Sequence, residues 1–216
     1  MNREQIRHGV YDRLGVDSSD AELPTEVIDR LINDALHYIE VREDWPWLQY
    51  PAAPSTPNVP TVANQDTYAM PADWLRVSEV VLIDAGGNKQ PLDMYSPREL
   101  DDRWPSSETG MPQEWAIYGD QLMVRPVPDG VYQLIVRYIR REPDLLDDAQ
   151  VPLMPNSFHA AICEIAAWMA FRRSSQDERA TDCWEAWQQW EAQMVGHRRR
   201  FRGPSRVRVR PGGYPG

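Results

Sequence analysis

The side chains most able to take part in chemistry are four histidines and two cysteines. His159 and Cys163 lie one helical turn apart, a spacing that two metal ligands can use. No further ligand accompanies them, and a closed zinc site needs four. Cys163 and Cys183 fall at apolar positions of predicted helices, so we expect buried free thiols rather than a disulfide. The sequence therefore indicates neither a metal site nor a cofactor site.

Motifs of common catalytic sites are absent from the sequence. There is no Gly-x-Ser-x-Gly nucleophile elbow, no Walker loop and no dinucleotide fingerprint. Pairs such as Asp101 and Asp102 are common in a chain with 33 acidic residues, whereas glycosidase chemistry needs two carboxylates across a cleft. We therefore expect a protein that is not an enzyme. A hydrolase using its acidic residues stays open, and a pocket with two opposed carboxylates would support it.

Arginines gather near the end of the chain. Seven of the 23 basic residues follow His197 with no acidic residue among them, which leaves 16 basic and 33 acidic residues, a net charge of −17. An acidic body therefore carries a basic tail, and the body repels a nucleic-acid backbone. After Gly203, arginine and valine alternate over residues 206–210, the form of a strand that adds to another protein's sheet. A disordered basic tail that solubilises the protein or touches nucleic acid is the alternative.

The 216 residues, 42% of them hydrophobic, suffice for one sizeable core and possibly a second small one. No apolar run approaches the roughly 18 residues of a membrane span, and the first ten residues lack the apolar centre of a signal peptide. We expect a soluble protein made in a cytoplasm, with no membrane partner.

Helical periodicity marks both ends of the chain. Residues 3–14 carry an apolar stripe that Gly15 ends, and a second helix runs from a candidate N-cap at Thr25 to about Glu43. Two further amphipathic helices begin near Pro155 and Asp177 and are expected to pack as an antiparallel pair. Together these helices predict a small four-helix bundle.

The middle of the chain has strand periodicity. Residues 114–118, 121–125 and 131–139 alternate apolar and polar residues, which predicts an antiparallel meander with a hairpin at Gly119 and Asp120. Earlier runs predict further strands, and a short helix should begin at Ser96. The earlier strand runs are 61–70, 75–83 and 90–95. The fold class is therefore α+β, a helical bundle with an antiparallel β-rich insertion and an extended C-terminal arm.

The expected boundaries follow these patterns. They are 1–49 for the first helical pair, 50–141 for a Pro-rich connector and the β-rich insertion, 142–200 for the second helical pair, and 201–216 for the arm. The stretch 142–155 is an acidic loop, best interpreted as solvated. Two local alternatives stay open. Trp45 and Trp47 around Pro46 form a core staple or a ligand platform, and the prolines of 50–60 form a linker or a recognition motif.

The order of several short motifs resembles the head-to-tail adaptor proteins of tailed bacteriophages, also called head completion or connector proteins. The resemblance covers residues 3 to 195 approximately. The motifs are Trp45-Pro46-Trp47, Gln65-x-x-Tyr68-x-x-Pro71, Gly110-x-Pro112, Pro126-x-Pro128-Asp129 and Leu153-x-Pro155-x-x-Phe158-His159.

This resemblance implies a structural protein of the virion neck, assembled in the host cytoplasm. Such adaptors form a ring, typically of twelve copies, beneath the portal protein; they extend the DNA channel without binding the genome specifically and present a docking surface to tail-side neck proteins such as a stopper or tail terminator. Their C-terminal segments commonly grip the portal. Carried over to this chain, the portal-binding arm comprises Arg198, Arg199, Arg200, Phe201, Arg202, Arg206, Val207, Arg208, Val209 and Arg210. The alternative is a nucleic-acid-binding packaging or regulatory factor that acts through the same arginines.

Overall fold

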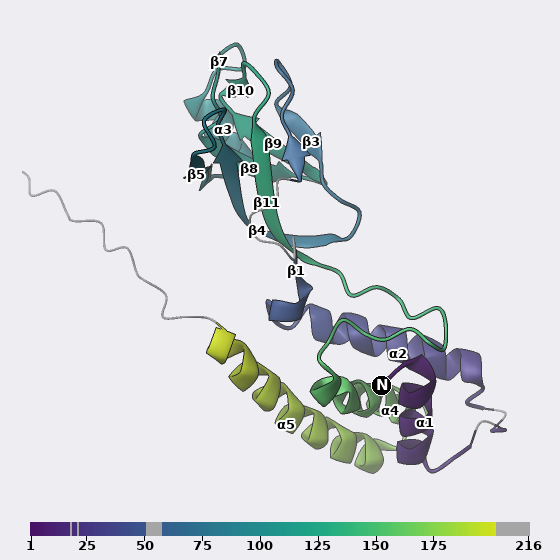
Figure 1. Cartoon of the computed structure of the whole chain (residues 1–216). Coiled ribbons are helices and arrows are strands. Elements are labelled where there is room, and N and C mark those ends of the chain that lie inside the picture. Colours follow the sequence, from purple (N-terminus) through teal and green to yellow (C-terminus); the bar gives the residue numbers. More distant parts are fainter. Residues whose placement is uncertain (18, 21, 51–57, 202–216) are drawn as a thin grey trace, which may run out of the picture. The chain divides into compact units, whose positions relative to one another are not determined.

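The computed structural model describes residues 1–216 except 18, 21, 51–57 and 202–216 (Figure 1). Within the described residues the chain is a mixed α+β protein with five α-helices and three β-sheets. It divides into a helical unit, which comprises Met1–Ile39 and Asp144–Gly216, and a β unit, which comprises Glu40–Pro143. The first and the last described residues thus belong to one unit, and the middle of the chain forms the other.

The helical unit contains four of the helices. They are α1 (Arg3–Leu14), α2 (Thr25–Glu40), α4 (His159–Arg173) and α5 (Asp177–Phe201), with a short 3-10 turn, η2 (Asn156–Phe158), before α4. Asn2 and Gln5 form a capping box at the start of α1. Gly15 ends α1 with a left-handed φ of 70°, which a residue without a Cβ adopts freely, as predicted.

An apolar stripe from each helix fills the interior of this unit. The fully buried residues include Ile6, Val10, Ile28, Ile32, Ala35, Ala161, Ile162, Ile165, Ala166, Trp187 and Met194. Their helical spacing agrees with the predicted helices. The prediction of Thr25 as an N-cap is wrong, because Pro24 supplies the carbonyl that accepts from Ile28 and Thr25 is already helical. None of the helices in the described residues is long and apolar enough to cross a membrane.

The β unit contains two larger sheets. The first is a five-stranded sheet with the order β1-β11-β4-β5, in which β2 also pairs with β11, and the second has the order β3-β9-β8-β6. The strands are β1 (Gln49–Tyr50), β2 (Val59–Pro60), β3 (Thr67–Ala69), β4 (Trp74–Ile83), β5 (Lys89–Pro91), β6 (Asp93–Met94), β8 (Glu114–Tyr118), β9 (Gln121–Arg125) and β11 (Gln133–Arg140). A small third sheet joins β7 (Thr109–Gly110) to β10 (Val127–Pro128).

One apolar core connects the two larger sheets. It combines Val80, Leu82, Leu134, Val136 and Tyr138 from the first sheet with Tyr68, Trp115, Leu122 and Val124 from the second. Helix α3 (Pro97–Arg103) begins at Ser96 with a capping box that includes Glu99, as its sequence predicts. Trp45 and Trp47, beside the 3-10 turn η1 (Pro46–Leu48), stack on each other with ring centroids 4.9 Å apart.

The predicted meander is wrong in its third strand. Residues 114–118 and 121–125 form the expected β8–β9 hairpin, with Gly119 at a positive φ of 61°. The third run becomes β11, which pairs along its length with β4 in the other sheet. Between them, Val127 pairs in parallel with Thr109, so the chain leaves the hairpin instead of turning back on it. The β6–β8 pair is also parallel, so the insertion is not wholly antiparallel.

Candidate interaction surfaces

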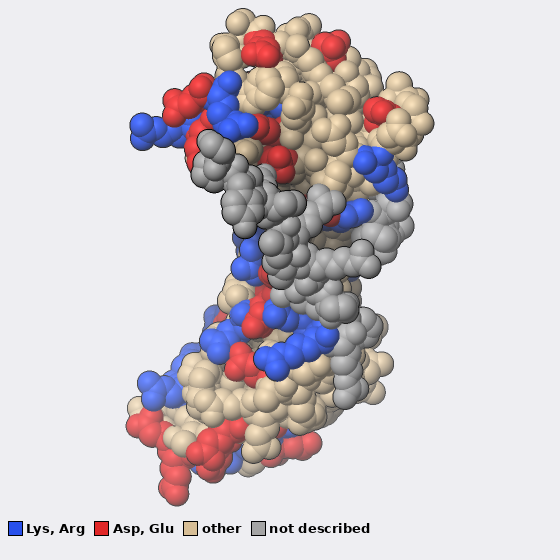
Figure 2. Space-filling view, turned by 90° about the vertical axis from the view of Figure 1, so that its left-hand side faces the viewer, with Lys and Arg blue, Asp and Glu red and all other residues tan. Residues whose placement is uncertain are grey.

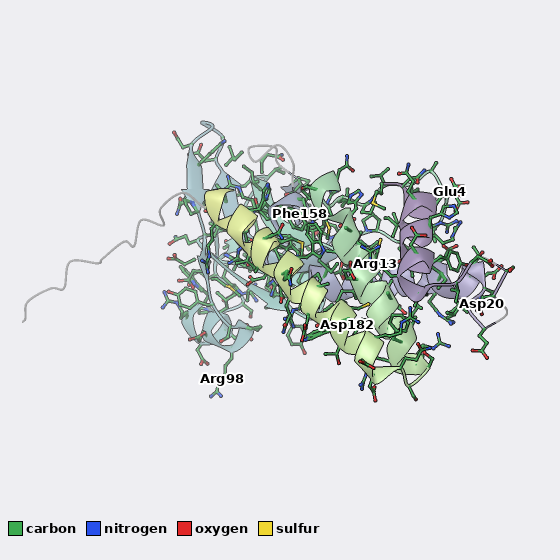
Figure 3. All side chains as sticks on the ribbon, turned by 90° about the horizontal axis from the view of Figure 1, so that it is seen from below. Glu4, Arg13, Asp20, Arg98, Phe158 and Asp182 are labelled. Atoms are coloured by element: carbon green, nitrogen blue, oxygen red, sulfur yellow. The ribbon has the colours of Figure 1, made fainter. Side chains whose placement is uncertain are left out.

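The predicted arm begins on the last turn of α5. Arg198, Arg199, Arg200 and Phe201 are the last four residues of this helix, so α5 includes the first four residues of the predicted portal-binding arm. Arg202, Arg206, Val207, Arg208, Val209 and Arg210 lie outside the described residues. The ring of His197 packs edge-on against Phe158, with centroids 5.3 Å apart, and Figure 3 labels Phe158 beside α5. The C-terminal end of α5 is therefore held against the start of α4.

Charge is distributed unevenly along α5. Asp177 and Glu178 occupy its first turn, whereas the end of the helix carries arginines, of which Arg199 is exposed. Both placements suit the helix dipole, because its N-terminus favours negative and its C-terminus positive side chains. Figure 2 shows acidic and basic side chains in neighbouring groups on the visible face of each unit. The first turn of α5 is therefore acidic, and its last turn, where the predicted arm begins, is basic.

The acidic loop is held by two arginines of α1. Arg7 donates to Asp29 of α2 at 2.7 and 2.9 Å and to Asp148 of the loop at 2.6 Å. Arg3 donates to the same Asp148 oxygen at 2.7 Å. These hydrogen bonds from Arg7 and Arg3 lower the pKa of Asp148 to about 2, and the Asp29 carboxylate raises the pKa of Arg7. The arginines therefore tie α1, α2 and the loop together.

Backbone groups of the loop are fixed as well. Asn33 of α2 accepts from the Leu145 amide at 2.9 Å and donates to its carbonyl at 3.4 Å. Gln150 accepts from the amides of Leu146 and Asp147 with its side chain, and its carbonyl accepts from the Arg3 amide at 2.9 Å. Leu145 is buried at 2% exposure. Residues 144–155, which we call the pinned loop, are therefore ordered without being helix or strand.

This stretch is a largely exposed loop, as predicted, but two of its acids also have partners in the helical unit. Asp148 and Asp144 make ion pairs, the latter with His37 at 3.1 Å, although both side chains stay about half exposed. No local pattern could have indicated these contacts, because the partners lie more than 100 residues away in the sequence. What the pinned loop leaves in solvent is apolar as well as acidic: Leu146 is 70% exposed and Val151 is 52% exposed.

Two hollows lie on the helical unit near the turn between α4 and α5. One, of about 370 Å³, is lined by Leu14, Leu23, Phe171 and Arg179 among others. Arg179 is already engaged there, because it donates to the Leu14 carbonyl at 2.9 Å and lies 4.4 Å from the Phe171 ring centroid. The bonded guanidinium and the apolar floor offer contact area.

The second hollow, of about 290 Å³, is lined by Trp168 and Trp184 among others, and the ring centroids of these two residues are 5.1 Å apart. Tyr38 packs on both rings. Arg172 and Asp177 at its edge form an ion pair at 3.2 Å. The polar groups are paired with each other, so this aromatic hollow is also better suited to packing than to catalysis.

The β unit contains a buried carboxylate with a complete set of partners. Glu114, 5% exposed, accepts from Arg103 at 2.6 and 3.1 Å and from the Trp104 indole at 2.7 Å. These bonds hold the end of α3 against β8, and the Glu114 carboxylate raises the pKa of Arg103. Asp101 and Asp102 are exposed on α3. Glu114 is therefore a structural carboxylate.

His159 and Cys163 occupy structural positions. The His159 ring is fully buried, with Nε2 2.8 Å from the Met154 carbonyl and Nδ1 2.7 Å from the Met1 amine, and burial lowers its pKa. The Cys163 thiol is buried against the Ile6 carbonyl, and burial raises its pKa to about 11. Cys183 is also a buried free thiol. Among the described residues no three His, Cys, Asp or Glu side chains are grouped as metal ligands.

Comparison with known proteins gives one finding. A family model described as SU10 adaptor protein matches residues 4–210, which is nearly the whole chain. No curated protein matches the chain significantly. The match spans both units, α5 and the alternating arginines and valines that follow it.

Proposed function

The chain belongs to the SU10 adaptor protein family, and we propose that it is the structural head-to-tail adaptor of a tailed phage, forming a ring beneath the portal. The match over residues 4–210 is the observation that carries this proposal, because it includes the helical unit, the β unit and most of the arm. In this proposal the ring extends the DNA channel. Its other surface receives further neck or tail proteins.

The charge of the chain supports a channel role. Outside the arm the net charge is −17, and an acidic wall repels phosphate and does not retain the passing genome. The buried Glu114 is paired with Arg103, whereas exposed acids such as Asp147 and Asp182 remain on the surface.

We assign portal binding to the arm, residues 198–210. The arm begins on the last turn of α5, and the packing of His197 on Phe158 holds this turn in place. Beyond the helix, a strand of alternating arginine and valine can add to a portal sheet edge through its backbone while its arginines meet acidic portal surface. This combination gives both affinity and a defined register.

Deletion of residues 202–216 tests the assignment, because it leaves all five helices intact. The truncated protein should keep the helical circular dichroism of the full chain and lose co-sedimentation with the portal protein of the same genome. A matched control, Asp177→Asn with Glu178→Gln, changes charge at the far end of α5 and should dock normally. Portal docking that survives the deletion would contradict the assignment.

A second function, nucleic-acid binding through the same arginines, is favoured by the seven positive charges after His197. Neutralising several phosphates makes affinity fall steeply with salt. Titration of the full chain and of the deletion with duplex DNA, at 50 and 200 mM salt, separates the two functions. Salt-sensitive binding that the deletion removes, together with no portal docking, would replace the adaptor role by the second function.

A further inference from the structure

The helical unit presents two surfaces that differ in shape and charge, and we propose that they join neighbouring copies of this chain. In this contact Leu146 of the pinned loop of one copy packs on Trp168 and Trp184, which line the aromatic hollow of the next copy. The inference rests on the proposed function, because it names the surfaces that join the copies of the ring. In a ring of more than two copies each copy presents one surface to one neighbour and a different, complementary surface to the other.

The pinned loop supplies the first surface. Among the described residues of the helical unit, the large apolar side chains that are more than half exposed are Leu146 at 70% and Val151 at 52%. The backbone beside Leu146 is already fixed, because Asn33 accepts from the Leu145 amide at 2.9 Å and Arg3 donates to the Leu145 carbonyl at 3.1 Å. A neighbour that covers this loop therefore loses little free energy to ordering it.

The aromatic hollow supplies the second surface. Trp168 of α4 and Trp184 of α5 line it, and both side chains are only partly buried. Tyr38 of α2 contacts both rings, with centroids 6.2 and 6.4 Å away, so the walls of the hollow are held in place. Its volume of about 290 Å³ accommodates a leucine side chain. Residues that fill a pocket with aromatic walls commonly dominate the binding free energy of an interface.

The charges beside the two surfaces are complementary. Asp147, next to Leu146, is exposed and makes no ion pair with any residue that the structure describes. At the edge of the hollow Arg172 is 60% exposed, and its partner Asp177 is 77% exposed. A pair as exposed as this one contributes little, so Arg172 can also pair with Asp147. The adjacent Arg173 is exposed and has no ion pair within the described part of the chain, so it adds to this attraction.

The two surfaces lie on different sides of the helical unit. Hydrogen bonds hold the pinned loop to α1 and α2, whereas α4 and α5 line the hollow, and α4 packs against both α1 and α5. Figure 3 labels Glu4, whose amide donates to the Asp148 carbonyl at 3.3 Å, on the α1 side. It labels Asp182, the neighbour of Thr181 in the hollow, on α5. The loop therefore does not reach the hollow of its own copy, and the occupant is a second copy.

A contact of this kind continues from copy to copy. Each added copy leaves one loop and one hollow free at the ends of the assembly, until rotation between neighbours closes the ring. The contact uses neither the β unit nor the arm. Both stay available in this arrangement to the portal and to tail-side proteins.

Disulfide trapping between two variants of the full chain tests the contact. One variant carries Leu146→Cys and the other Thr181→Cys, and both positions are exposed, whereas the native Cys163 and Cys183 are buried. An equimolar mixture, oxidised and separated on a non-reducing gel, should contain at least about tenfold more linked dimer than either variant alone. Because a disulfide needs Cα atoms within about 7 Å of each other, Asp177→Cys serves as a second partner position at the hollow.

The matched control replaces Leu146→Cys by Met94→Cys, which is 64% exposed in the β unit, and its mixture with Thr181→Cys should stay within about twofold of the single variants. Adding Asp147→Lys to the Leu146→Cys variant should lower the yield, because like charges then face each other.

The outcomes separate this interface from the adaptor role. No excess of linked dimer with either partner position, alone or with the portal protein, overturns the proposed interface. A ring seen by light scattering without this linkage overturns the interface and leaves the adaptor role intact. Linkage in a protein that does not dock on the portal supports the interface and contradicts the proposed function.

Discussion

In each unit an arginine paired with a carboxylate holds an irregular segment in place. The two residues of the pair are close in the sequence in the β unit and far apart in the helical unit. In the β unit Arg103 and Glu114 are 11 residues apart, and their pair holds α3 against β8. In the helical unit Arg7 and Asp148 are 141 residues apart, and their pair joins the two sequence segments that make up this unit. The Arg103–Glu114 pair stabilises a local connection, whereas the Arg7–Asp148 pair holds together segments that are distant in the sequence.

The difference in separation predicts a difference in what each pair stabilises. A short connection costs little entropy to close, and Arg103 is half exposed, so water can replace its partner. Arg7 is only 11% exposed and serves both Asp29, itself 17% exposed, and Asp148. Without Arg7, the Asp29 carboxylate keeps the Arg3 guanidinium 3.6 Å away, in a place that water reaches poorly.

Removal of Arg7 should therefore have the largest effect. Arg7→Met should lower the free energy of unfolding by about 2 to 3 kcal/mol, because two charge-assisted contacts are lost at once. Urea denaturation followed by circular dichroism measures it. Arg98→Met is the control, since Arg98 is exposed and lies 3.9 Å from Asp102, and it should change stability by less than about 0.5 kcal/mol. A similar loss for both variants would remove the distinction between the two kinds of pair.

Glu114→Gln should have a smaller effect, about 1 to 2 kcal/mol, because the amide oxygen can still accept from the Trp104 indole and Arg103 can turn to water. The matched control is Glu108→Gln, an exposed residue of the same connection. Hydrogen exchange should show faster exchange in α3 and β8 for Glu114→Gln alone. Faster exchange throughout the helical unit instead would mean that this pair is not local.

The smallest effect should come from Asp148, whose carboxylate is about half exposed. Its folded pKa, about 2, lies below its ordinary value of 3.8, so the ionised form stabilises the fold above about pH 4. That contribution is lost as the pH falls toward 2. The stability difference between the wild type and Asp148→Asn should be constant from pH 6 to 4 and shrink below pH 4. A difference that does not change with pH would show that Arg3 and Arg7 do not act through charge.

The same contrast explains what the sequence could predict. The helix over residues 3–14, its apolar stripe and its Gly15 cap could be predicted because each depends on residues close together in the sequence. The start of α3 could be predicted for the same reason, from Ser96 and Glu99. The β8–β9 hairpin is correct for the same reason.

Pairings between distant residues could not be predicted in this way. Alternation shows which side of a strand is buried but not which strand lies beside it. The sequence therefore predicts β11 beside β9, whereas β11 pairs with β4. The acidic loop had the same difficulty, because Arg3 and Arg7 carry no local sign of their partner Asp148. The arm could be identified because seven arginines and no acidic residue follow His197, and its binding to a portal stays a prediction.

The most direct test of the adaptor role is the molar mass of the purified protein by light scattering, alone and mixed with the portal protein of the same genome. The adaptor role predicts either a stable ring or a smaller species that joins the portal as a ring of many copies. A protein that stays monomeric and leaves the mass of the portal unchanged would contradict it.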